Sequence, residues 1–240
     1  MNNTIQTISL VHLTIAFIPV VVILVILFKW SLNTGSAFYA VSRMLGQLLL
    51  VGYFLTYIFE SDNALIIMTI LTVMLLSSSW IALRMVKARR RTLFRNAFFS
   101  IALGGGSVLF VITQWVLNLD PWYFPRYMVP LAGMIFSNSM NSVSLASERL
   151  YAELERDVPF LEARKIALQA ALIPIVNSLF AVGLVSIPGM MTGQILSGVS
   201  PLIAARYQIM VMCMIFGAAG ISAACFLWLA ERVPVLKSKD

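Results

Sequence analysis

The sequence has few ionisable side chains. Only 11% of its 240 residues are Asp, Glu, Lys or Arg, whereas 60% are hydrophobic; soluble domains average about 25% charged and about 45–50% apolar residues. A water-soluble fold with this balance would expose too much apolar surface. The composition therefore excludes soluble classes and predicts an integral membrane protein. The net charge of +7 comes from basic residues clustered beside the apolar runs, which indicates orientation in lipid, so no nucleic-acid partner is expected.

Acidic residues and lysine are absent from the apolar runs, where the candidates for a charged group are Arg43, Arg206 and His12. A carrier driven by a proton or sodium gradient usually needs an ionisable group at depth. Arginine does not release its proton at physiological pH. His12 lies near the outer end of the first run and fits a headgroup-level residue better than a proton relay. The chain thus has little means of coupling transport to an ion gradient.

The sequence also lacks motifs for catalysis and nucleotide hydrolysis. It contains no G-x-x-x-x-G-K-[ST] phosphate loop, no metal-ligand set at zinc spacing and no G-x-S-x-G turn. Cys213 and Cys225 lie on one expected helix, about 18 Å apart, which is too far for a disulfide. We expect neither an enzyme nor a cofactor, and assign no metal ligands. Energy for pumping must come from a partner, or else the protein is a passive pore.

Seven apolar runs are long enough to cross a bilayer, which takes about 20 residues per helix. They cover about 8–28, 37–59, 64–83, 97–117, 127–147, 167–187 and 204–230. The first run has no Lys or Arg before it and is longer than the core of a signal peptide, so it is interpreted as a retained span. Residues 1–240 are therefore predicted to form a single all-α transmembrane domain.

The short loops predict the orientation, because Lys and Arg prefer the cytoplasmic side. The loop RMVKARRRTLFR (84–95) holds six basic residues and no acid, so it is placed inside. Alternation then puts Lys29, the 148–165 loop and the tail ERVPVLKSKD (231–240) inside as well. The outer loops carry acidic residues instead (Glu60, Asp62 and Asp120). We expect the N-terminus outside and the C-terminus in the cytoplasm.

The longest predicted cytoplasmic segment is SERLYAELERDVPFLEARKIALQAALIP (147–174). Its leucines recur at helical spacing among charges, with a break at Pro159. Two short amphipathic helices along the inner membrane face would have this pattern. Such a segment could dock on a soluble ATPase and transmit its motion, or it could be a loop solvated by its charges. The candidate coupling residues are Glu148, Arg149, Glu162 and Arg164.

Two runs contain residues that favour close helix contacts. GMIFSNSMNSVSLASERL (133–150) places Asn138, Asn141 and several serines in an otherwise uncharged span. Small polar residues in membrane helices usually support helix packing, although they can also line a polar cavity. The triplet GGG (104–106) indicates a flexible point or a close approach of a neighbouring helix.

The stretch SIPGMMTGQILSGVSP (186–201) is too polar and too rich in glycine to be another span. Pro188 and Gly189 are expected to end a helix, and Gly193 and Gly198 to allow turns. A re-entrant loop at the outer face is predicted, because non-helical backbone at depth survives only among helices or beside water. Methionine thioethers suit soft ions better than ferric iron, so packing is the alternative role. The candidate path or gating residues are Met190, Met191, Thr192, Gly193, Gln194, Asn138, Asn141, Asn177 and Arg206.

Three stretches together resemble a known family. VSRMLGQLLLVGYFLTYIFE (41–60), the 133–150 segment and GLVSIPGMMTGQILSGVSPLIAARYQI (183–209) are similar to the FetB-type ABC-transporter permeases. That family comprises bacterial iron exporters and plant aluminium-tolerance relatives. One departure is that FLEARKIALQAALIP (160–174) keeps Glu162 and Ala163 but lacks the Gly-Ala step that follows in relatives, so docking could shift to 148–158.

The resemblance implies a permease of the bacterial inner membrane that forms a homodimer in lipid and binds a separate ATP-binding cassette subunit. Its cargo would be iron or another metal. An organic phosphate, nucleotide sugar or lipid is the alternative within the same class, since a plant relative is associated with nucleotide-sugar transport. A passive channel is the alternative from another class.

Overall fold

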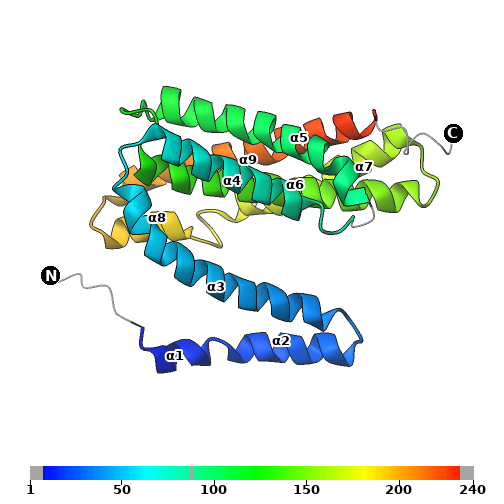
Figure 1. Ribbon diagram of the computed structural model, residues 1–240, viewed down its shortest axis with the longest axis horizontal. Helices are drawn as coiled ribbons and strands as arrows, with labels where there is room; N and C mark the ends of the chain where they lie inside the picture. The colour runs from blue at the N-terminus through cyan, green and yellow to red at the C-terminus, as the bar shows by residue number, and fades with distance from the viewer. Residues whose placement is uncertain (1–7, 87–88, 233–240) are drawn as a thin grey trace. The chain divides into compact units, whose positions relative to one another are not determined.

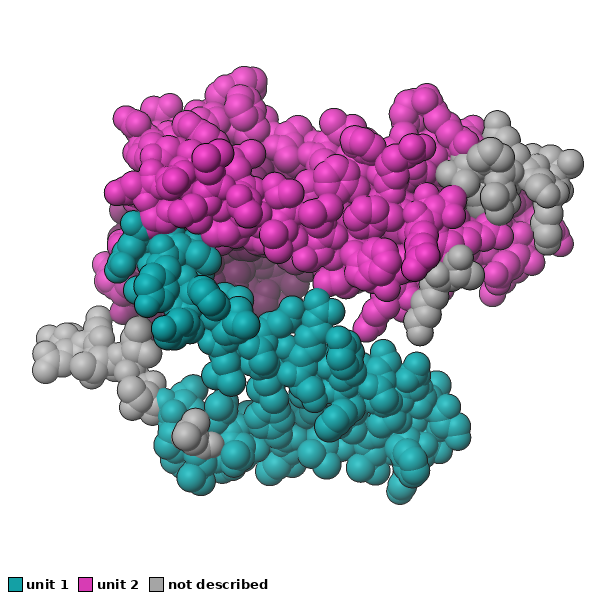
Figure 2. Space-filling model, in the orientation of Figure 1, with its two compact units in different colours: residues 1–60 teal, residues 61–240 magenta. Residues whose placement is uncertain are grey.

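The computed structural model describes residues 8–86 and 89–232 as helices joined by short connections (Figure 1). Lys87 of the predicted inner loop, the predicted tail from 233 onward and residues 1–7 lie outside the described residues. The chain divides into two compact units, residues 1–60 (unit 1) and 61–240 (unit 2), coloured separately in Figure 2. The prediction of an all-α membrane protein is confirmed.

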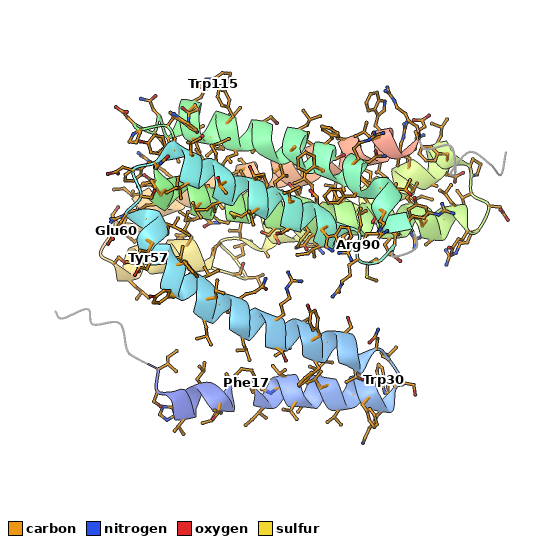
Figure 3. The ribbon with its side chains drawn as sticks, in the orientation of Figure 1. Phe17, Trp30, Tyr57, Glu60, Arg90 and Trp115 are labelled. Carbon is orange, nitrogen blue, oxygen red and sulfur yellow. The ribbon has the colours of Figure 1, made fainter. Side chains whose placement is uncertain are left out.

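Unit 1 is a helical hairpin preceded by one short helix. Its elements are α1 (Leu10–Ile15), α2 (Ile18–Lys29) and α3 (Thr34–Phe59). The break between α1 and α2 precedes Pro19, which suits the first turn of a helix because it has no N–H to donate; Phe17 lies at the break and Trp30 at the turn between α2 and α3 (Figure 3). Asn33 caps α3 by accepting a hydrogen bond from the Ser36 N–H at 3.0 Å.

Unit 2 is a bundle in which α9 is central. Its elements are α4 (Ala64–Ala82), α5 (Arg90–Phe110), the π-helical turn η2 (Val111–Val116), α6 (Pro125–Leu154), α7 (Phe160–Ala181), α8 (Gly189–Leu196) and α9 (Pro201–Ala230). Helix α9 packs against α5, α6, α7 and α8, while α4 packs against α5 and α6. Much of the buried face of α9 is alanine (Ala204, Ala218, Ala219, Ala223 and Ala230). Small residues of this kind let neighbouring helix backbones approach closely.

The GGG triplet marks a close approach of α5 to α9 and α6. A Cβ atom on Gly104 would lie 2.6 Å from the backbone nitrogen of Ser222 in α9, and one on Gly105 would lie 2.9 Å from Ile135 in α6. Gly106 has nothing within 4 Å. The close-contact interpretation is therefore confirmed for Gly104 and Gly105, where any larger side chain would push α5 away from its neighbours.

Five stretches in the described residues are long and apolar enough to cross a membrane: 11–29, 34–59, 64–82, 90–116 and 201–230. They match five of the seven predicted runs. Helices α6 and α7 contain 30 and 22 residues, which is sufficient length, but their sequences are more polar. Their crossing of the membrane stays a prediction.

Several local predictions are wrong. Segment 147–174 does not form two short surface helices: α6 continues to Leu154, and α7 runs unbroken from Phe160. Pro159 precedes the first turn of α7, where its missing N–H removes no intrahelical hydrogen bond. Helix α7 ends at Ala181, short of the predicted 187, because Val182 is extended and Gly183 has φ 83°.

The 186–201 stretch also differs from expectation. Pro188 and Gly189 do not end a helix but begin one, since Pro188 is the N-cap of α8. Gly193 lies within that helix rather than in a turn, whereas Gly198, with φ 90°, makes the predicted turn. A short helix therefore replaces most of the expected irregular loop, and its re-entry into the membrane stays a prediction.

Candidate functional site

The turn between α6 and α7 (residues 155–159) marks one end of unit 2, which we call the hairpin end. The end of α9 lies here too, because Glu231 Oε2 is 3.1 Å from Arg164 Nη1. Asp157 has φ 59°, and the Val158 N–H donates to the Glu153 carbonyl at 3.2 Å. The chain thus reverses within a few residues, and α7 returns antiparallel to α6.

Glu153 is a buried carboxylate at the hairpin end. Its side chain is 6% exposed, and Oε1 lies 2.6 Å from Arg149 Nη2 and 3.6 Å from Arg156 Nη1. A buried carboxylate is tolerated only when it is paired, and these two arginines supply the pairing from the same helix and from the turn. Glu153 was not predicted from the sequence, although its spacing of four residues from Arg149 and three from Arg156 is a recognisable signal.

The structure divides the four predicted coupling residues into two kinds. Arg149 and Arg164 are held by ion pairs within unit 2, with Glu153 and Glu231 respectively. Glu148 and Glu162 are exposed. The arginines therefore organise the hairpin end, whereas the two glutamates are exposed on its surface.

The predicted basic loop is anchored at the same end of the bundle. Arg90 donates to the Trp80 carbonyl from Nη2 at 2.6 Å and lies 3.8 Å above the Trp80 ring, and Figure 3 labels its position. Arg89 lies 5.0 Å from the centre of the Tyr151 ring. Burial raises the pKa of the Tyr151 phenol, and the charge of Arg89 offsets part of that effect. Arg90 therefore contacts α4, and Arg89 contacts α6.

The serines of α6 connect it to its neighbours. Ser139 donates to the Ala218 carbonyl in α9 at 3.2 Å, and Ser142 donates to the Ala171 carbonyl in α7 at 3.4 Å. Asn138 donates to the Met134 carbonyl of its own helix at 2.8 Å. These bonds support the packing interpretation of the polar run for its buried members. Asn141 in α6 and Asn177 in α7 are exposed and take no part in this packing.

The remaining predicted gating residues lie in α8 and at the start of α9. Helix α8 packs against α9, and the Thr192 hydroxyl donates to the Pro188 carbonyl at 3.2 Å. Met190 and Met191 are half-buried, and Gly193 and Arg206 are exposed. In the described part of the chain, Gln194 Oε1 is buried without a hydrogen-bond partner, which makes it the one predicted path residue with an unsatisfied polar atom.

Other polar groups inside unit 2 were not predicted. Gln208 is 6% exposed and its Oε1 has no hydrogen-bond partner among the described residues. Thr113 in η2 is buried and donates to the Leu109 carbonyl at 2.9 Å. A π-helical turn is a rare element that often lies at functional sites. The sequence carried no signal for either, because their burial depends on which helices surround them.

Metal-ligating side chains are not gathered in the described residues: no group of three or more His, Cys, Asp or Glu lies close enough to hold an ion. His12 lies 3.1 Å from the Ser9 hydroxyl, and both cysteines are free. Amide, hydroxyl and thioether groups are what remain along the helices.

The long apolar helices of both units are those of an integral membrane protein. The chain belongs to the family described as Uncharacterised protein family (UPF0014), whose model matches residues 10–233. No solved structure matches it.

Three relatives show how far the similarity extends. The Synechocystis protein named UPF0014 membrane protein slr1647 is 37% identical over 79% of this chain and 80% of the relative. The Escherichia coli protein named "Probable iron export permease protein FetB" is 34% identical over 90% of this chain and 88% of its own. The Arabidopsis thaliana Protein ALUMINUM SENSITIVE 3 is 32% identical over 85% of this chain and 80% of the relative. The predicted family resemblance is confirmed.

Proposed function

We propose that this chain is the membrane-spanning subunit of an ATP-driven exporter of iron or another metal, energised by a separate ATP-binding subunit. The observation that carries the proposal is the lack of acidic residues and lysine in the predicted spans together with the lack of a phosphate loop. A pump without these groups needs an external source of energy. The similarity to a relative named as an iron export permease supports the cargo class.

The hairpin end is the part of unit 2 best suited to receive that subunit. The exposed carboxylates are those of Glu155 in the turn and Glu162 in the first turn of α7. The Glu153 cluster stabilises the end of α6 and the turn, and the Arg164–Glu231 pair joins α7 to the end of α9. A push on this turn would reach α6 and α7 directly, and α9 through the Arg164–Glu231 pair. Orientation with the hairpin end in the cytoplasm follows from the basic loop at 84–95, because Arg89 and Arg90 lie at the same end.

Co-purification tests the proposal. The chain would be co-expressed with a candidate ATP-binding cassette subunit and isolated in mild detergent. We expect a stable complex, and we expect Glu155→Arg combined with Glu162→Arg to reduce the captured ATPase several-fold without lowering the amount of folded membrane subunit. Glu60→Arg, an exposed acidic residue of unit 1, is the matched control. A chain that stays alone despite co-expression would refute the proposal.

A second cargo class is favoured by one observation. The charged side chains within the candidate spans away from their basic ends are arginines, such as Arg43 in α3 and Arg206 in α9, and no metal cluster forms in the described residues. Arginine suits an anionic phosphate or metal chelate better than a bare cation. Stimulation of ATP hydrolysis in the reconstituted pair by Fe²⁺, or instead by nucleotide sugars and phosphate esters, separates the two classes.

A further inference from the structure

Helices α5 and α9 each carry an exposed line of side chains that changes from apolar to basic toward the hairpin end of unit 2. On α5, Arg95, Phe99 and Leu103 are exposed, and their spacing of four residues places them one above another on the helix surface. On α9, the exposed Trp228 is followed at the same spacing by the exposed Arg232. We call these five residues the α5–α9 face.

The two helices run antiparallel and are joined at this end by a hydrogen bond. Asn96 Nδ2 of α5 donates to the Leu229 carbonyl of α9 at 3.1 Å. Further along α5, a Cβ atom on Gly104 would meet Ser222, which comes earlier in α9. Figure 1 shows α5 and α9 side by side. The Asn96–Leu229 bond therefore fixes which residues of the two helices share a level.

Arg95 and Trp228 point to the same side of this helix pair. Each comes one residue before a member of the Asn96–Leu229 bond, and one residue turns a helix by about 100°. Because the helices are antiparallel, the two turns have opposite sense in space and bring both side chains onto one outer face. Arg232, three residues after Leu229, turns to that side as well. Toward the hairpin end, Arg95 is one residue and Arg232 three residues beyond the bond, a difference of about 3 Å in height.

The two arginines of the face have no acidic partner. Neither Arg95 nor Arg232 forms an ion pair among the described residues. Residues 63–119, which include all of α5, contain no Asp or Glu, and Glu231, beside Arg232, is instead 3.1 Å from Arg164 of α7. Two neighbouring cations without a counter-charge repel each other, and an anion held between them would stabilise both.

The rest of the face is apolar. Phe99, Leu103 and Trp228 are 49%, 61% and 51% exposed, and the Arg232 guanidinium lies 3.9 Å above the Trp228 ring. Tryptophan is enriched at the level of the lipid headgroups, where a long basic side chain can keep its charge in the polar layer. The face thus offers positive charge at headgroup level and apolar surface toward the membrane centre.

We propose that the α5–α9 face is a binding site for an anionic phospholipid, with the phosphodiester between Arg95 and Arg232 and an acyl chain along Phe99 and Leu103. The planar guanidinium group matches the oxygens of a phosphate, and the net negative headgroup supplies the missing counter-charge. A soluble anion would use the arginines alone, whereas a lipid uses the whole face. The proposal needs only the membrane location of α5 and α9, and it is independent of the cargo and of the energy source.

Lipid-dependent thermal unfolding tests the proposal. The purified chain in detergent would be titrated with dioleoyl phosphatidylglycerol or with dioleoyl phosphatidylcholine, which has the same acyl chains. We expect phosphatidylglycerol to raise Tm at lower concentration. Arg95→Gln and Arg232→Gln should each weaken that response about fivefold, the effect of one basic residue at an anionic membrane surface, and leave the phosphatidylcholine response unchanged. Lys165→Gln, at an exposed base of α7 near the same end, is the matched control and should respond as the unmodified chain does.

Two further arms separate the lipid from simpler ligands. Arg95→Lys keeps the charge but not the planar fork, so its response should lie between those of the unmodified chain and Arg95→Gln. Inorganic phosphate and glycerol phosphate supply the head of the ligand without its chains, and we expect neither to raise Tm at concentrations where phosphatidylglycerol saturates. Equal responses to the two lipids, or a full response to phosphate alone, would overturn the proposal.

Lipid retention distinguishes this site from a surface for an acidic protein. The chain would be isolated from native membranes with the ATP-binding subunit, and its bound lipids would be quantified by mass spectrometry. We expect Arg95→Gln with Arg232→Gln to retain several-fold less anionic phospholipid and to capture as much ATPase as before. Variants that retain the lipid but lose the ATPase would assign the face to the protein partner and refute the lipid site. A chain that binds the lipid but never captures an ATPase would refute the proposed function alone.

Discussion

Unit 1 and unit 2 are both built from long apolar helices, but among the described residues unit 2 has a buried core and unit 1 does not. No residue of α2 or α3 is buried within the described structure, whereas α9 alone buries a face of alanine, methionine and phenylalanine against its neighbours. In unit 1, side chains such as Leu49 contact almost nothing within the unit. The comparison teaches that apolar composition places a helix in the membrane, whereas its stability as part of a fold depends on what packs against it.

Leucine truncation gives the largest contrast between the units. Leu131 in α6 is 2% exposed and Leu49 in α3 is 78% exposed. We expect Leu131→Ala to lower the free energy of unfolding by about 2 kcal/mol, the low end for a buried leucine, because in detergent the loss is one of packing rather than of transfer from water. Leu49→Ala is expected to change it by less than about 0.5 kcal/mol.

Unfolding by SDS titration of the purified chain, followed by tryptophan fluorescence, measures both. Equal losses for the two variants would mean that Leu49 is covered by protein and would remove the contrast between the units.

The glycine triplet sharpens the contrast within unit 2. Gly104→Ala would place a Cβ atom against the Ser222 backbone, which cannot move without displacing α9. We expect the free energy of unfolding to fall by about 1–3 kcal/mol, which is typical of overpacking. Gly106 lies two residues further along the same helix, and a Cβ added there would meet nothing within 4 Å. Gly106→Ala is therefore expected to be neutral or to stabilise by about 0.5–1 kcal/mol, since alanine favours the helix. Thermal unfolding in detergent compares the two, and equal behaviour would contradict the close contact between α5 and α9.

The buried carboxylate at the hairpin end is expected to have a smaller effect. Glu153→Gln removes the charge that Arg149 and Arg156 share while keeping the side-chain shape. Both arginines remain partly exposed, at 39% and 67%, so water can solvate them, and we expect a loss of about 1–2 kcal/mol. Glu155 is exposed in the turn two residues further on, so Glu155→Gln is the control and is expected to leave the free energy of unfolding unchanged. The same SDS titration checks both variants. An unchanged free energy of unfolding for Glu153→Gln would show that the cluster contributes no stability.

The sequence predicted the membrane class, the family and the five most apolar helices, because hydropathy is a local property of each run. It also predicted that GGG marks a close contact. It did not predict the continuous α6 and α7, because the pattern around Pro159 indicates a break between surface helices, whereas Pro159 is the N-cap of a helix that packs one face against α6 and α9. It could not reveal Gln208 or the Arg164–Glu231 pair, whose partners are brought together only by the packing of helices distant in sequence.

The Arg164–Glu231 pair is expected to give the smallest effect and the most specific one. Both side chains are about one-third exposed, at 33% and 37%, so solvent screening keeps their coupling energy near 0.5 kcal/mol. A double-mutant cycle with Arg164→Gln and Glu231→Gln, measured by SDS titration, isolates that term from the cost of each substitution. ATP hydrolysis by the complex is a separate measurement of what the pair does. If the pair transmits motion from the α6–α7 turn to α9, either variant would lower transport-linked ATP hydrolysis by more than its loss of stability explains. Variants that keep full ATPase coupling while showing the expected 0.5 kcal/mol would assign the pair to folding alone.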